Sequence, residues 1–168
     1  GCGGGGGIRA SYGAIQLFNV TVVSNMSQAG AGIFLYHGAP NLRNVLIADN
    51  VATGEGGGAM YFDGASPDIV NCTIANNRAT GDGEGGGLNV SYYSHPKLIN
   101  CVVWSNWPQQ VWFNSDWYGM AVTFDHSDLQ DGVAGVVTLG KGPVNWLAGS
   151  VTNNPAFAGA GDWGLQTG

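Results

Sequence analysis

The sequence predicts an all-β fold, a single-stranded parallel β-helix, from three observations. An eleven-residue phrase recurs at 40–50, 67–77 and 96–106, with a looser copy at 15–25. A glycine-rich lead segment precedes each copy, and apolar and polar residues alternate inside it. Repeats of about 20 to 50 residues are typical of solenoids, and no segment sustains the apolar spacing of three and four residues that marks a helix.

The lead segments supply the first strand of each turn. They read GGGGGIRA (3–10), GAGIFL (30–35), GEGGGAMYF (54–62) and GEGGGLNV (83–90). Each places glycines before a short apolar run. Because glycine adopts positive backbone angles without steric cost, these residues allow a tight reversal and a close approach between neighbouring turns.

The phrase supplies the second and third strands, which meet at an asparagine. In one copy the apolar positions are Leu42, two residues before Asn44, and Val45 and Ile47, one and three residues after it. Side chains of a strand alternate between its two faces, so this change of parity predicts a sharp bend between two short strands.

The asparagines at the bend are predicted to have a structural role. They are Asn19, Asn44, Asn71 and Asn100, and steps of 25, 27 and 29 residues separate them. An amide can bond backbone groups that a corner leaves unpaired, stacked amides can bond one another, and asparagine tolerates the left-handed conformation. We therefore expect a ladder of stacked amides at this position.

The copies of the phrase and the degenerate segments after them predict about six turns of 25–29 residues, stacked at the strand spacing of about 4.8 Å. Residues 122–132 fit the phrase as a degenerate turn with His126 at the bend, and 133–168 are assigned to further degenerate turns. The aromatic-rich segment 107–121 is expected to leave the coil. The whole range 1–168 then forms one β-helix domain.

Composition narrows the partners. The chain has a net charge of −6 and only five lysines and arginines, which argues against a nucleic-acid surface. No apolar run approaches the ~18 residues that crossing a bilayer requires. No amphipathic helix is predicted at either end to cover the open strands, so we expect a piece of a larger protein or a unit that stacks on its own copies.

The repeats carry a family resemblance. The glycine-rich lead followed by NCTI and a later Asn, and the ending in which SDLQDG leads to NNPAF and GDWGLQ, resemble right-handed parallel β-helix repeats of secreted and surface-attached bacterial proteins. These include polymorphic outer-membrane-protein-like and pectate-lyase-like repeats. The resemblance implies a right-handed coil and an extracellular or cell-surface location, and it spans polysaccharide lyases, epimerases, adhesins and autotransporter passengers.

One predicted column contains the residues best suited to acid–base chemistry. Counting from the last glycine of each lead places Tyr12, His37, Asp63 and Tyr92 on one exposed flank. His37 beside Asp63 could serve as a base with an orienting carboxylate, as catalysis would require. The alternative interpretation is a polar corner of the solenoid without catalytic function.

Aromatic side chains are the other candidates. Trp107, Trp112, Trp117 and Tyr118 crowd into one segment. Exposed flat rings bind sugars by stacking on their apolar faces, so these residues, with Tyr12 and Tyr92 of the column, are candidate glycan-binding residues. The alternative is that they pack over the side of the coil.

Calcium is the one candidate cofactor. Acids and glycines alternate in GEGGG (54–58) and GDGEGGG (81–87), which makes Glu55, Asp82 and Glu84 candidate ligands, although the strict nine-residue calcium repeat is missing.

Two cysteines share an inward column. Cys72 and Cys101 lie one turn apart, close enough for a disulfide, and equally suited to be buried free thiols.

These observations favour an extracellular structural or binding scaffold that engages glycans or its own copies, the latter through a head-to-tail filament. The alternative is a polysaccharide-active enzyme of the β-helix class, a lyase or a glycoside hydrolase.

Overall fold

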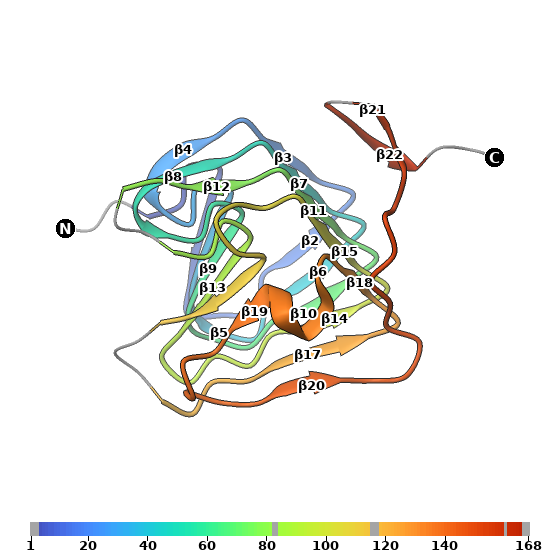
Figure 1. The fold of residues 1–168 in the computed structure, drawn as a ribbon. Helices are drawn as coiled ribbons and strands as arrows, with labels where there is room; N and C mark the ends of the chain where they lie inside the picture. The colour runs from blue at the N-terminus through green and yellow to red at the C-terminus, as the bar shows by residue number, and fades with distance from the viewer. Residues whose placement is uncertain (1–3, 82–83, 115–117, 160, 166–168) are drawn as a thin grey trace.

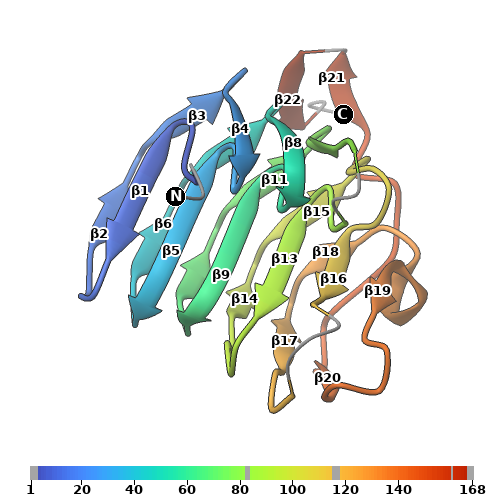
Figure 2. The same ribbon diagram turned by 90° about the vertical axis from the view of Figure 1, so that its left-hand side faces the viewer.

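The predicted parallel β-helix is confirmed. The computed structural model describes residues 4–81, 84–114, 118–159 and 161–165, and the chain coils through stacked parallel sheets (Figure 1). Equivalent strands of successive turns lie side by side along the axis (Figure 2). The six strands of each of the two longest sheets correspond to about five turns, one fewer than the sequence predicts.

The first and second sheets each contain one strand per turn. The first sheet comprises β1 (Ile8–Ser11), β5 (Ile33–Gly38), β9 (Met60–Ala65), β13 (Leu88–Ser91), β16 (Val111–Phe113) and β19 (Val136–Val137). The second comprises β2 (Gln16–Phe18), β6 (Asn41–Arg43), β10 (Asp68–Val70), β14 (Lys97–Ile99), β17 (Val122–Asp125) and β20 (Val144–Trp146). All pairings in both sheets are parallel.

The third sheet follows the asparagine bend, and a fourth closes the early turns. The third comprises β3 (Thr21–Val23), β7 (Leu46–Ala48), β11 (Thr73–Ala75), β15 (Val102–Trp104) and β18 (Asp128–Leu129). The fourth comprises β4 (Met26–Ala29), β8 (Val51–Gly56) and β12 (Arg78–Ala79). The sequence predicts three strands per turn, so this fourth strand is a correction, and it places a further corner after the third sheet.

The interior consists of the columns that the alternation predicts. Leu42, Val45 and Ile47 are at most 1% exposed, and their equivalents in the next two turns are also buried. Burying one such aliphatic side chain contributes about 1.5–3 kcal/mol, so repetition of the column supplies much of the stability. In the degenerate turn, Phe124 and Leu129 are also completely buried, as the alignment of that segment predicts.

The bend asparagines adopt the left-handed backbone that the sequence suggests. Asn19, Asn44, Asn71 and Asn100 have φ between 51° and 55°, and His126 takes the same conformation at 47°. Their side chains are exposed, and Asn44 Nδ2 donates to Asn19 Oδ1 over 3.1 Å. Their main contribution is therefore the backbone turn.

The continuous amide ladder lies at the second asparagine of each phrase. Each backbone N–H and each Nδ2 donates to the side-chain oxygen one turn further on, over 2.8–3.0 Å, through Asn25, Asn50, Asn77 and Asn106. Gln110 ends the ladder by accepting from Asn106 Nδ2 at 2.9 Å. The sequence predicts this ladder at the first asparagine of each phrase. The structure corrects the prediction, because the ladder lies six residues later.

A second polar column runs beside the bend. Cys101 N donates to Ser127 Oγ at 3.1 Å, and Ser127 N donates to Ser150 Oγ at 3.3 Å. Val45 N contacts Cys72 Sγ at 3.4 Å in the same way. Both cysteines are buried free thiols, which decides between the two alternatives, and burial raises the pKa of Cys101. This column satisfies backbone N–H groups at the corner.

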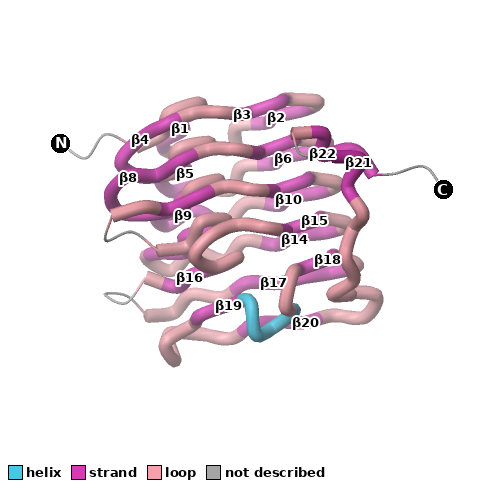
Figure 3. Tube along the Cα trace, turned by 45° about the horizontal axis from the view of Figure 1, so that its top comes forward, coloured by secondary structure: helices cyan, strands magenta, loops and turns pink. Residues whose placement is uncertain are grey.

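The last part of the chain leaves the coil. After β20 and the short 3₁₀ helix η1 (Gly132–Gly135), the antiparallel hairpin of β21 (Phe157–Gly159) and β22 (Asp162–Leu165) runs back alongside earlier turns (Figure 3). The coil continues to Val151, whose backbone N donates to the Ser127 carbonyl at 2.9 Å, so the expectation of degenerate turns over 133–168 is wrong beyond that residue. The predicted excursion at 107–121 is also corrected, because its centre forms β16, a regular strand of the first sheet.

Candidate functional site

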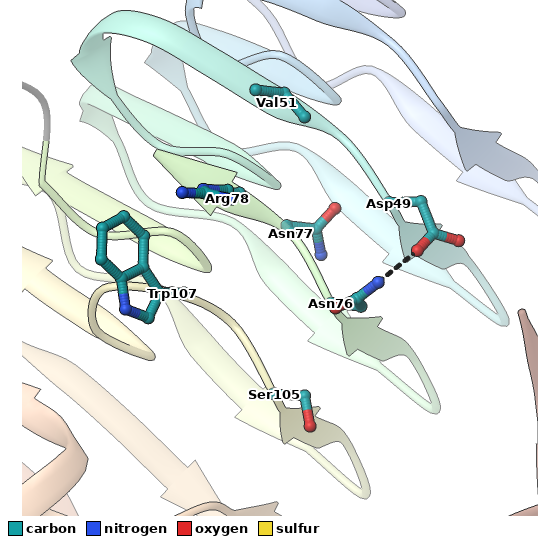
Figure 4. A pocket seen from close by; sticks show the side chains of 7 residues that line it. All are labelled: Asp49, Val51, Asn76, Asn77, Arg78, Ser105 and Trp107. Atoms are coloured by element: carbon teal, nitrogen blue, oxygen red, sulfur yellow. Dashed lines mark hydrogen bonds between the residues drawn. The ribbon is translucent and has the colours of Figure 1, made fainter. Parts of the chain in front are cut away.

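The corner between the third and fourth sheets is hollowed into a pocket of about 410 Å³. Its lining comes from three successive turns and consists of Asp49, Val51, Asn76, Asn77, Arg78, Ser105 and Trp107 (Figure 4). Asn77 belongs to the buried ladder, and the other six residues directly flank asparagines of that ladder. The ladder therefore supports the floor of the pocket, while its neighbours in sequence form the rim.

A left-handed corner turns the polar rim outward. Asp49, Asn76 and Ser105 have φ of 58°, 53° and 57°. Asn76 Nδ2 donates to Asp49 Oδ1 at 2.6 Å (Figure 4). The second carboxylate oxygen of Asp49 accepts from the indole Nε1 of Trp163 in the terminal hairpin, at 3.1 Å. Asp49 is thus held from two sides.

Arg78 and Trp107 form the opposite side of the pocket. The guanidinium carbon of Arg78 lies 4.7 Å from the centroid of the Trp107 ring, within the range of a cation–π contact. Arg78 forms no ion pair among the described residues, where the one salt bridge joins His126 and Asp125. Trp107 is 56% exposed. The pocket thus offers a positive charge and a large aromatic surface to a ligand.

The chemistry of this pocket suits a polyhydroxylated ligand. The Arg78 guanidinium donates hydrogen bonds, and the Ser105 hydroxyl and the Asn76 amide both donate and accept them. The indole of Trp107 supplies an apolar face. A concave surface with one aromatic platform and a few convergent polar groups is the usual composition of a small-ligand site.

The structure aligns three members of the predicted column, Tyr12, His37 and Tyr92, but the fourth, Asp63, lies one residue out of register. Asp63 pairs with Tyr36, and Gly64 takes the place beside His37. Burial raises the pKa of the Asp63 carboxyl, and the nearby His37 opposes this rise. The expected base and its carboxylate therefore occupy adjacent columns instead of one.

Aromatic rings gather where that column was expected. We call the set of Tyr12, Tyr36, His37, Tyr92 and Tyr93 the aromatic corner. The rings of Tyr12 and His37 stack with centroids 5.4 Å apart, His37 meets Tyr92 edge-on at 5.7 Å, and Tyr92 meets Tyr93 at 5.4 Å. This corner lies between the first and second sheets.

The other aromatic candidates do not form one surface. Trp112 lies in β16 between Asn89 and Val137 of the neighbouring strands. Tyr118 is 66% exposed and packs under Lys141 Nζ, 3.8 Å from its ring centroid. Trp117 lies outside the described residues. Of the described members of this group, only Trp107 lines the pocket.

The residues that complete the pocket were missed in the sequence. Asp49, Asn76, Arg78 and Ser105 directly flank the second asparagine of successive phrases. The repeat itself could therefore have identified these residues. Neighbouring side chains of an extended chain point to opposite faces, so the residues on either side of an inward-facing asparagine must face outward at the same corner.

The two described calcium candidates, Glu55 and Glu84, belong to no group of metal-binding side chains. Glu55 is exposed, Glu84 Oε2 accepts from Gln109 Nε2 at 2.6 Å, and Asp82 lies outside the described residues. Within the described ranges, no three acidic, histidine or cysteine side chains are grouped to hold a metal. Likewise, no helix in this part of the chain combines the length and apolar character that a membrane crossing needs.

Comparison with known proteins identifies the architecture. The model of a protein family described as a right handed beta helix region matches residues 6–166. No curated protein and no solved structure matches the chain.

Proposed function

Because the chain belongs to the right-handed β-helix family, we propose that it is an extracellular scaffold that binds saccharides in the pocket between Arg78 and Trp107. The resemblance of its repeats to those of secreted β-helices supports the proposed location outside the cell. The contact between the guanidinium and the indole is the observation that carries the proposal. It provides a fixed hydrogen-bond donor and an aromatic platform on the same concave surface.

The surrounding structure supports binding by a preformed site. Asn77, in the floor of the pocket, is completely buried and bonded within the amide ladder. Asp49 and Asn76 are joined at 2.6 Å, so the polar rim is also ordered before a ligand arrives. Side chains that are already fixed lose little conformational entropy on binding, which favours affinity.

Electrophoretic retardation in native gels tests the proposal. The gels contain mixed-linkage β-glucan, xyloglucan, polygalacturonate or alginate, and the wild-type chain is expected to be retarded in at least one of them. Trp107→Ala and Arg78→Ala should each weaken the retardation in that gel. Phe18→Ser is the matched control, because Phe18 is a 48% exposed aromatic residue outside the pocket. Unchanged retardation of both pocket variants would exclude this site.

A second copy of the chain is the other partner that the sequence favours. End-to-end stacking would bring β-strand edges of two molecules together and give a heterologous contact. Light scattering coupled to size-exclusion chromatography measures it directly. A mass equal to one chain at all concentrations would contradict self-stacking and would leave the saccharide proposal untouched.

A further inference from the structure

The aromatic corner lies on the side of the coil opposite the pocket. One early turn passes in order through the first, second, third and fourth sheets. Tyr12 lies between β1 and β2, at the junction of the first and second sheets, whereas Asp49 lies between β7 and β8, at the junction of the third and fourth (Figure 1). Two sheets therefore separate the corners in either direction around the coil.

The backbone at the aromatic corner is strained in a way that a purely structural corner would not need. Tyr12, His37, Tyr92 and Tyr93 all have positive φ, between 44° and 55°. Three of these residues are tyrosines, which are uncommon in this region, whereas glycine, asparagine and histidine are accommodated more easily there. The bend of the same coil does use asparagine, at Asn19 and its equivalents. Strain of this kind is concentrated at functional sites.

Two of the rings at this corner are largely exposed to solvent. Tyr12 is 71% exposed and Tyr93 is 58% exposed, so neither ring is explained by packing in the core. Tyr12 stacks on His37 with ring planes 12° apart, so each ring covers one face of the other. The exposed ring surfaces of Tyr12 and Tyr93 form the platform of this corner, and such surfaces can pack on the apolar side of a sugar ring.

A cleft beside the platform supplies polar groups. Its volume is about 460 Å³, and Arg9, Ser11, Tyr12 and His37 contribute to its lining. The guanidinium carbon of Arg9 lies 4.8 Å from the centroid of the Phe34 ring. The corner thus repeats the combination found in the pocket, namely exposed aromatic rings, neighbouring hydroxyl groups and an arginine held against an aromatic ring.

We propose that the aromatic corner is a second saccharide site, and that one coil therefore bridges two polysaccharide chains. The inference rests on the proposed saccharide binding in the pocket. Sites on opposite corners of a rigid coil cannot both engage one short stretch of a polymer. Their geometry links separate chains and does not add avidity on a single one.

Two readouts on the same variants test bridging. Retardation in native gels with the four polysaccharides reports binding, and light scattering of protein mixed with the same polysaccharides reports linked chains. Trp107→Ala removes the platform of the pocket. Tyr12→Asn with Tyr93→Asn removes that of the corner and keeps a residue that tolerates positive φ. Phe18→Ser again serves as the control.

If the protein bridges two chains, each variant altered at only one of the two sites should still be retarded, several-fold more weakly than wild type. Neither of these variants should increase light scattering. The protein altered at both sites should be neither retarded nor able to scatter. Retarded wild type without increased scattering would overturn bridging while leaving the pocket intact. Loss of all retardation in Trp107→Ala alone would overturn the second site and support the pocket.

The reverse pattern separates the two proposals further. If the tyrosine variants abolish retardation and Trp107→Ala has no effect, the corner binds saccharide, the pocket does not, and bridging is overturned. A wild-type chain that none of the four polysaccharides retards would overturn both proposals together.

Discussion

The indole nitrogen of Trp163 donates a hydrogen bond of 3.1 Å to Asp49 Oδ2, although 114 residues separate the two. The bond fastens the terminal hairpin to the corner that bears the pocket. Inside the hairpin, Trp163 meets Phe157 edge-on with ring centroids 5.2 Å apart. The hairpin is therefore held by a small contact outside the repetitive core.

Trp163→Phe should loosen the hairpin without unfolding the coil. The substitution keeps an aromatic ring against Phe157 and removes the indole N–H that donates to Asp49 Oδ2, at a local cost of about 1 kcal/mol. We expect several-fold faster hydrogen exchange and proteolysis in 157–165, with an almost unchanged melting temperature. Equal protection of the hairpin in both proteins would show that this bond does not hold it.

Asn77→Ala should be among the most destabilising substitutions in the chain. The change removes the acceptor for Asn50 N and Nδ2 and the donor to the carbonyls of Ile47 and Ala75. Leaving buried polar groups unpaired costs about 1–3 kcal/mol each, so a loss of at least about 3 kcal/mol is expected in urea unfolding.

Asn71→Gly is the matched control for the ladder. Asn71 is the exposed bend residue of the same phrase, with φ of 54°, a conformation that glycine adopts freely. Its free energy of unfolding should stay within about 1 kcal/mol of wild type. A large loss of unfolding free energy in Asn71→Gly, or a small loss in Asn77→Ala, would contradict this explanation and would indicate that the first asparagine of the phrase stabilises the fold.

Gly86→Ala should disrupt the contact between two turns. A Cβ atom at this position would overlap with the carbonyl oxygen of Trp107, a backbone atom that cannot move aside on its own. Overpacking of this kind costs about 1–3 kcal/mol or more, measurable by chemical denaturation. Gly13→Ala is the control, since its Cβ would meet no atom within 4 Å. Comparable losses for both variants would contradict this explanation.

Asp63→Asn should stabilise the protein at pH 7. Burial raises the pKa of this carboxyl in the folded state, so the folded chain retains the proton to a higher pH than the unfolded chain does. Stability from this group is therefore full below the unfolded pKa of about 3.9 and decreases as the pH rises through the folded value. Unfolding at pH 3 and pH 7 should show a gain for the variant at pH 7 and little difference at pH 3.

The interior of the coil was readable because its causes are local and repeated. The alternation around Asn44 directs Leu42 and Ile47 into the interior of the coil, since strand side chains change face at each residue. This holds for any sequence of the neighbouring turns. The degenerate turn was recognised for the same reason, with Phe124 buried and His126 at the bend.

Register between turns was less readable, because the phrases are separated by unequal numbers of residues. Counting from the glycines placed Asp63 beside His37, whereas strand pairing places Gly64 there and Asp63 beside Tyr36. A slip of one residue changes which side chains share a column. The predicted acid–base pair depended on that single step.

The solenoid, its inward columns and the asparagine bends are specified by the sequence alone, because a repeated pattern of period two has one way to bury its apolar face. The tertiary structure decided which asparagine lies inside, since both positions of the phrase carry the same residue and only the fourth sheet turns the second one inward. It also brought Arg78 over Trp107 and Trp163 to Asp49. Those contacts join residues from different turns, and their distances depend on how the turns stack and on where the terminal hairpin folds back.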